Sequence, residues 1–98
     1  MRQQVTIIAT LHARPGMEQA LEARMRTMIA ATRQEPGCIR YDLQRSELDS
    51  ASYVMIEYWA DAQALQLHFD SPHMAALSQD LPELLDRPVH IERLTPVA

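Results

Sequence analysis

The hydrophobic pattern of this chain switches between the two-residue period of strands and the longer period of helices in the order strand, helix, strand, strand, helix, strand. Turn-forming residues stand at the switches, among them Arg14-Pro15-Gly16 and Glu35-Pro36-Gly37. This order is typical of an α+β, ferredoxin-like fold (β-α-β-β-α-β), a four-stranded antiparallel sheet with helices on one face. We therefore expect a single domain over residues 1–98. The predicted strands and first helix are Val5–His12, Met17–Gln34, Cys38–Arg45, Tyr53–Trp59 and Val89–Leu94.

The segment Tyr53–Met74 joins a strand to the second helical region. Its first seven residues are rich in aromatic and β-branched types, which favour a buried strand. Asp61 is a predicted N-cap, and Ser71-Pro72 predicts the start of another helical run, with serine as cap and proline at the first helical position. Leu81-Pro82 and Arg87-Pro88 then predict a short irregular piece before the last strand.

The predicted strands are largely apolar or small on both faces, whereas the predicted helices cover only one. In Val5–His12, for example, isoleucine side chains fall on each face. A second copy of the chain would cover the remaining face if the two sheets paired. We therefore expect a homodimer through the sheet face, a dimeric α+β barrel, with Arg40 and Asp42 near the interface.

Charge and cysteine content limit the partners and the compartment. The net charge is −4, lysine is absent, and the nine arginines are spread along the chain. This pattern argues against nucleic acid or an anionic membrane as the main partner. No apolar run approaches the roughly 20 residues that span a bilayer, and no secretory segment follows Met1. The single Cys38 cannot form an intramolecular disulfide, so nothing in the sequence implies an oxidising compartment. From these observations together we expect a cytoplasmic protein.

Two residues of the Tyr53–Met74 segment are the first candidates for a site. His68 lies on or beside the inward face of a short predicted helix, where it could act as a general base or orient a hydroxyl group. The alternative is a partly buried histidine bonded to a backbone carbonyl. Trp59 could form an aromatic wall of the same pocket, or it could belong to the core.

Glu57 and Tyr41 complete the candidate site. Alternation places Tyr53, Met55, Glu57 and Trp59 on one strand face, so Glu57 is a carboxylate in an apolar surrounding that must be paired or protonated. We favour pairing with an arginine, and Arg40 on the neighbouring strand could serve. Tyr41 resembles Trp59 as a wall or core residue.

The sequence predicts no metal site and no cofactor. It contains no HxH, HExxH or CxxC spacing, and His68 and His73 are five residues apart with Pro72 between them, which does not align them on one helix face. Neither a GxGxxG motif nor a phosphate-binding loop is present.

Three stretches, ATLHARPGMEQALE, EPGCIRYDL and YVMIEYWADAQALQLHFDSPHM, resemble the antibiotic biosynthesis monooxygenase family over about residues 5 to 95. The resemblance implies ferredoxin-like homodimers with a pocket between sheet and helices in each subunit. It also implies that several members oxygenate quinols or anthrones without metal, flavin or haem. Where haem-degrading members carry asparagine, tryptophan and the ligating histidine, this chain has Ala9, His68 and Ser78, so haem degradation is not expected.

The resemblance makes a cofactor-independent monooxygenase the leading hypothesis. A small aromatic molecule and dioxygen would be its partners, His68 the catalytic residue, and Trp59, Tyr41 and Glu57 the substrate-binding residues. Since ordinary side chains do not activate dioxygen, the protein would deprotonate the substrate, hold it and exclude water. Two alternatives remain open: a non-catalytic ligand-binding or stress-response dimer, and an isomerase of a phosphorylated signalling sugar. The isomerase would require converging arginines such as Arg40, Arg45 and Arg93.

Overall fold

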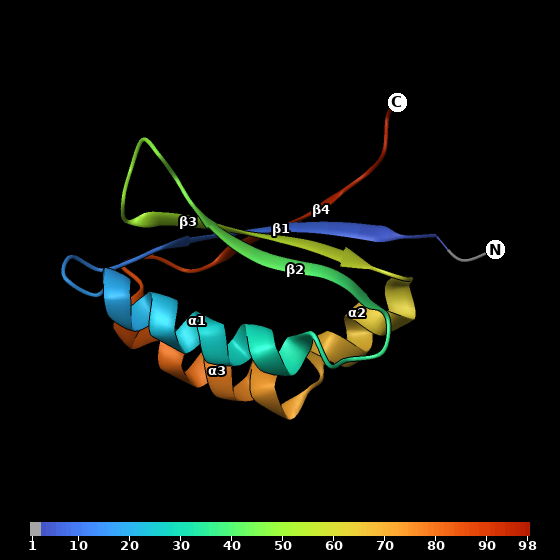
Figure 1. The fold of residues 1–98 in the computed structure, drawn as a ribbon, viewed down its shortest axis with the longest axis horizontal. Helices are drawn as coiled ribbons and strands as arrows, with labels where there is room; N and C mark the ends of the chain where they lie inside the picture. Colours follow the sequence, from blue (N-terminus) through green and yellow to red (C-terminus); the bar gives the residue numbers. More distant parts are fainter. Residues whose placement is uncertain (1–2) are drawn as a thin grey trace.

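The structure, a computed structural model, describes residues 3–98. Strands and helices follow the predicted order, and the second helical region consists of two helices, as Ser71-Pro72 predicted (Figure 1). In chain order the elements are β1 (Val5–His12), α1 (Glu18–Thr32), β2 (Cys38–Arg45), β3 (Ser52–Trp59), α2 (Ala62–Phe69), α3 (Pro72–Leu84) and β4 (His90–Leu94).

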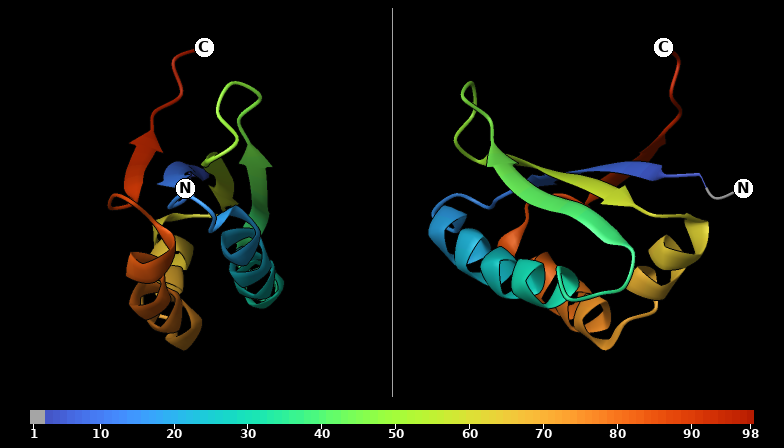
Figure 2. Two further views of the ribbon diagram at one scale, coloured as in Figure 1. Left: turned by 90° about the vertical axis from the view of Figure 1, so that its left-hand side faces the viewer. Right: turned by 45° about the vertical axis from the view of Figure 1, so that its right-hand side comes forward.

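The four strands form one antiparallel sheet in the order β2-β3-β1-β4. All three helices lie on the same face of this sheet, as both views of Figure 2 show. The predicted ferredoxin-like α+β fold is therefore confirmed. A register shift between Cys38 and Arg40 interrupts the pairing of β2 with β3 near the start of β2, at the end of the sheet next to α2.

Alternate residues of the two central strands supply the floor of the core. In β1 the odd-numbered residues are buried and the even-numbered ones are partly exposed. In β3 the predicted inward set is likewise buried: Tyr53, Met55, Glu57 and Trp59. The inward stripe of α1 was also predicted correctly, with Leu21, Met25, Met28, Ile29 and Thr32 buried. Each large apolar side chain removed from water contributes roughly 1.5–3 kcal/mol to the folded state.

The side chains that begin α2 and α3 were predicted correctly. Asp61 accepts a hydrogen bond from the Ala64 N–H at 2.8 Å, and Ser71 accepts one from the Met74 N–H at 3.2 Å. Pro72 is the first residue of α3, where its missing N–H costs nothing. Two helices therefore meet at a corner made of only Asp70 and Ser71.

The predicted break at Leu81-Pro82 is wrong, because α3 continues through Pro82 to Leu84. Pro82 has no N–H to donate to the carbonyl of Ser78, four residues earlier, so the helix loses one backbone hydrogen bond there and still continues for two residues. The Pro82 carbonyl oxygen accepts from Nε and a terminal nitrogen of Arg14, at 3.2 and 3.0 Å.

The sheet face opposite the helices remains partly exposed in the single chain. Its even-numbered β1 and β3 residues have intermediate exposure, and every residue of β4 is exposed. Within residues 3–98, no helix is long and apolar enough to cross a membrane.

Candidate functional site

A cavity of about 160 Å³ lies between the sheet and the helices. Most of its wall is aliphatic and sulfur-containing, contributed by β1, β3, α1, α3 and β4. Four of the lining side chains carry polar groups: Tyr41, Glu57, His68 and Ser78. A concave, mostly apolar space with a few converging polar groups is the usual form of a small-molecule site.

A larger groove of about 1190 Å³ runs along α1 beside the end of β2. It is open and polar, and its charged side chains pair with one another: Arg33 with Asp42, and both Arg26 and Arg45 with Glu22. We therefore place the candidate site in the smaller cavity, where buried titratable groups converge.

His68, near the end of α2, is almost fully buried and packed between aromatic rings. The centre of its imidazole lies 4.6 Å from that of Trp59 and 5.4 Å from that of Tyr41. Nδ1 lies 2.8 Å from Oε2 of Glu35. Among residues 3–98 no protein atom forms a hydrogen bond with the other ring nitrogen, Nε2. Because an ionised carboxylate can only accept, Nδ1 carries the proton and Nε2 keeps a free lone pair.

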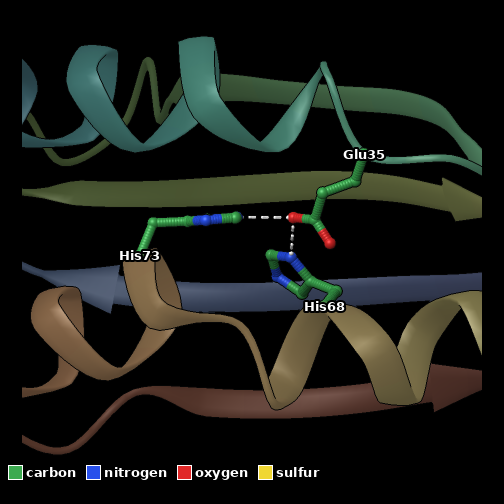
Figure 3. Close-up of side chains that lie close together, drawn as sticks. All are labelled: Glu35, His68 and His73. Atoms are coloured by element: carbon green, nitrogen blue, oxygen red, sulfur yellow. Dashed lines mark hydrogen bonds and ion pairs between the residues drawn. The ribbon is translucent and has the colours of Figure 1, made fainter.

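Glu35 and His73 extend this contact toward the surface (Figure 3). The same Oε2 atom of Glu35 lies 2.6 Å from Nε2 of His73. Glu35 comes from the turn between α1 and β2, His68 from the end of α2 and His73 from the first turn of α3. Exposure of the side chains rises outward, from 2% for His68 to 13% for Glu35 and 28% for His73.

Opposing influences set the charge of His68. Burial lowers its pKa from the ordinary value of 6.5 because the imidazolium loses hydration, and Glu35 opposes this by hydrogen bonding and by its negative charge. The net shift is downward, so the ring is neutral at neutral pH and can accept a proton at Nε2.

Glu57 is a second proton-exchanging group in the same cavity. The Trp59 indole N–H donates to its Oε1 at 3.0 Å. Burial raises the pKa of Glu57 from 4.5 to about 7. The hydrogen bond from Trp59 lowers this pKa in part, and the negative charge of Glu35 raises it further. The predicted pairing with Arg40 is wrong, because Arg40 opposes Tyr58 on the outer face and donates to Asp42 and to the Tyr58 hydroxyl.

Tyr41 and Trp59 have different relations to the cavity. Tyr41 lines it, and burial raises the pKa of its hydroxyl well above 10, so the hydroxyl stays protonated. Trp59 is fully buried and is not among the cavity-lining residues. It lies behind the wall, where its ring packs on His68 and its N–H holds Glu57.

Sequence reasoning missed Glu35 and His73. Glu35 was taken only as the end of the first helix, before Pro36. The five-residue spacing of His68 and His73 was judged as if both lay on one helix, whereas the Asp70–Ser71 corner places them on two. The signal available in the sequence was the acid at that turn together with two histidines flanking Ser71-Pro72.

These three residues are also the group that could hold a metal ion. One ligand atom from each of Glu35, His68 and His73 lies within 4.8 Å of the others, and two histidines with a carboxylate suit several divalent cations. In the present arrangement, hydrogen bonds of 2.8 and 2.6 Å join the same atoms directly.

Comparison with known proteins connects the whole chain to one family. The family model described as "Antibiotic biosynthesis monooxygenase" matches residues 4–80. The Mycobacterium tuberculosis protein named "Putative monooxygenase Rv0793" is 38% identical over 97 residues, which cover 99% of this chain and 95% of that protein. Its solved structure superimposes with a TM-score of 0.90 over 98% of this chain and 97% of that one.

Two further relatives differ in name and in length. The Escherichia coli protein named "Probable quinol monooxygenase YgiN" is 29% identical over 85 residues, covering 76% of this chain and 82% of the relative. An uncharacterised Synechocystis protein, sll1783, is 28% identical over 88 residues. The match covers 90% of this chain but only 60% of that relative's length.

Proposed function

Because this chain belongs to the antibiotic biosynthesis monooxygenase family, we propose that it oxygenates a small quinol with dioxygen. One observation carries the proposal. His68, with a free Nε2 lone pair, lines the same mostly apolar cavity as Glu57 and Tyr41. A base, a protonatable carboxyl group and a phenol around an apolar space suit a flat molecule with hydroxyl groups at its edge. The E. coli relative named as a quinol monooxygenase supports the same substrate class.

The cavity volume favours a quinol over the larger anthrones. An apolar cavity of roughly 150 Å³ binds a single benzene ring, and the cavity beside His68 measures about 160 Å³. A tricyclic anthrone would need the walls to move apart. We therefore propose a one-ring quinol as the best substrate.

The reaction begins with proton transfer from a quinol hydroxyl to Nε2 of His68. The resulting quinolate gives one electron to triplet dioxygen, and the semiquinone and superoxide radicals combine at the ring carbon beside the oxygen. His68 returns its proton to the peroxide. Removal of the hydrogen on that carbon then breaks the O–O bond, and the departing hydroxide takes a proton to become water. One quinol and one dioxygen thus give one hydroxyquinone and one water.

In this reaction the protein positions the substrate and transfers protons, whereas the electrons come from the substrate. Proton transfer from a well-placed base is worth typically 10²- to 10⁴-fold in rate. Glu57, whose pKa is raised to about 7, can donate a hydrogen bond to a substrate oxygen when protonated and can receive one after ionisation. In this proposal no cofactor takes part.

Dioxygen consumption tests the proposal. Purified protein, treated with a strong chelator, is given methyl-substituted benzoquinols, a naphthoquinol and an anthrone in turn. We expect dioxygen uptake and an equal yield of hydroxyquinone, fastest for the one-ring substrates, and loss of at least 10²-fold in kcat for His68→Ala. No uptake with any substrate, or the same uptake in His68→Ala, would contradict the assignment.

The arginine positions do not favour an isomerase of a phosphorylated sugar. Arg40 pairs with Asp42, and Arg45, near the other end of β2, pairs with Glu22. Arg93 lies on β4, at the opposite edge of the sheet. A phosphate group would therefore find no cluster of these three cations.

We also propose a homodimer that pairs the partly exposed sheet faces, because half-exposed apolar residues such as Ile8 and Ile56 lie there opposite one another. Sedimentation equilibrium at micromolar concentration should give twice the chain mass of 11.2 kDa. A single species at the chain mass would refute the dimer without affecting the proposed chemistry.

A further inference from the structure

We propose that Glu35 and His73 are positioning residues that hold His68 in the tautomer with Nε2 unprotonated, facing the cavity. The inference rests on the proposed function for its catalytic meaning. Its geometric basis is independent of that function: one carboxylate oxygen accepts from two histidines on two different helices, at 2.8 and 2.6 Å.

The tautomer matters because it decides which nitrogen can act as a base. A neutral imidazole has an N–H on one ring nitrogen and a lone pair on the other. A hydrogen-bond acceptor beside one nitrogen keeps the proton there, so the other nitrogen has the lone pair. Glu35 occupies Nδ1, so the lone pair stands at Nε2, on the ring that lines the cavity. Once Nε2 takes up a proton, the same carboxylate stabilises the imidazolium.

His73 keeps Glu35 in place. Without a second donor, a glutamate at 13% exposure could turn toward water by rotating its three side-chain bonds. The N–H of His73 holds the shared oxygen from the outer side, and the Asp70–Ser71 corner fixes where His73 stands. The Ser71 hydroxyl donates to the His68 carbonyl at 2.7 Å, which ties this corner to the end of α2.

The turn that carries Glu35 is equally restrained. The Glu35 N–H donates to the Thr32 carbonyl, and the Glu35 carbonyl accepts from Cys38. Gly37 follows with φ +84°, and its carbonyl accepts from the Ala60 N–H at 2.8 Å. The α1–β2 turn, the β3–α2 turn at Ala60 and the Asp70–Ser71 corner thus bring Glu35 and the two histidines into contact.

Other titratable groups near His68 could affect the same measurement. Tyr41 packs against its ring from β2, and Glu57 faces the cavity from β3. His73 approaches from α3 and, when charged, lowers the pKa of His68. The remaining cavity walls from β1, α1 and β4 are apolar. The test therefore changes Glu35 and His73 separately and leaves Tyr41 and Glu57 intact.

The first measurement is ¹⁵N–¹H NMR of the imidazole groups in the whole protein without substrate. We expect neutral His68 to carry its proton on Nδ1, the less common form in free histidine. In Glu35→Gln the pKa of His68 should fall, because a neutral amide no longer stabilises the imidazolium. Glu83→Gln removes the same charge from an exposed position on α3 and should leave His68 unchanged.

The second measurement is the pH profile of kcat for dioxygen uptake. In Glu35→Gln, kcat should fall at least about tenfold, as when the orienting carboxylate of a histidine base is lost, and the acid limb should move to lower pH. His73→Leu should also lower kcat, while His73→Gln, which keeps an N–H donor of similar reach, should restore most of it.

The two measurements separate two kinds of failure. A proton on Nε2 of neutral His68, or a His68 pKa that is unchanged in Glu35→Gln, would overturn the positioning role whether or not the protein consumes dioxygen. The expected NMR result without turnover on any quinol would support the positioning role and contradict the proposed function.

Discussion

Two histidine–carboxylate clusters lie at opposite ends of this molecule and are built in inverse ways. Near α2, two histidines share one oxygen of Glu35. At the other end, where β1 finishes, one histidine lies between two carboxylates. Nδ1 of His12 is 2.9 Å from Asp86, and its Nε2 is 2.9 Å from Asp49.

The difference indicates that His68 can take part in proton transfer, whereas His12 connects parts of the fold. Both ring nitrogens of His12 face carboxylate oxygens, so neither is open toward a substrate hydroxyl group. The His12 cluster instead ties the end of β1 to the β2–β3 loop and to the segment after α3. His68 has one nitrogen engaged and one free, and its ring lines a cavity. Within residues 3–98, the two histidines therefore differ in whether one ring nitrogen is left without a hydrogen-bond partner in a residue that lines a cavity.

The largest expected effect comes from making the same substitution at both ends. His68→Gln should lower kcat for quinol oxygenation by roughly 10²- to 10⁴-fold, because the base is lost. His12→Gln should leave kcat within about twofold. Dioxygen uptake at saturating quinol measures both. Equal losses in the two variants would mean that position in the cavity does not distinguish these histidines.

The two ends should also respond oppositely to pH. The pKa of Glu57 is raised from 4.5 to about 7, chiefly by burial. Between these two pH values the native state therefore binds more protons than the unfolded state. The stability from protonated Glu57 is complete below pH 4.5 and is lost as pH rises through about 7. At about 1.4 kcal/mol for each pH unit, this loss is about 3 kcal/mol. In Glu57→Gln, urea unfolding should show that the decline between pH 5 and 7.5 has largely disappeared.

At the other cluster the sign is reversed. A backbone hydrogen bond from Ala51, followed by His12, lowers the pKa of Asp49; Arg87, followed by His12, lowers that of Asp86. Their stabilisation is present above pH 3.8 and is lost as pH falls below it. Asp49→Asn should therefore flatten the acid side of the stability profile and leave the neutral side unchanged. A neutral-side change in Asp49→Asn would contradict this assignment.

The smallest expected difference comes from the glycines beside the two ends. Gly16 and Gly37 both have positive φ, 82° and 84°, and alanine at either position should lower the free energy of unfolding by about 1–2 kcal/mol. A side chain at Gly16 would meet open space, whereas at Gly37 its Cβ would lie 2.6 Å from that of Ala64. Gly37→Ala should therefore cost a further 1–2 kcal/mol or so, measured by urea unfolding. Equal losses would show that α2 yields to the added methyl group.

The fold was predictable because each element carries its own local signal. Periodicity identified the inward faces of β1, β3 and α1, and Asp61 and Ser71 marked the starts of two helices correctly. The error at Pro82 arose because the helix continues past the proline and buries Leu84, and packing of this kind cannot be predicted from a local sequence pattern.

The site was predictable only in part. His68, Glu57 and Tyr41 were singled out as polar or aromatic residues in apolar surroundings, and they do line one cavity. Glu35 was missed because its partners are 33 and 38 residues away in the chain. The predicted Arg40–Glu57 pair failed because strand pairing alone does not determine which sheet face an arginine shares. Contacts between turns depend on tertiary packing and leave no periodic trace.

The two-residue corner between α2 and α3 has a consequence for how this sequence can vary through evolution. Each residue added to a helix turns its continuation by about 100°, so one inserted or deleted residue at Asp70–Ser71 would carry His73 away from Glu35 with every side chain still present. Substitutions on the exposed face of α2 leave that geometry intact. Descendants of this gene can therefore change the composition around the corner far more readily than its length.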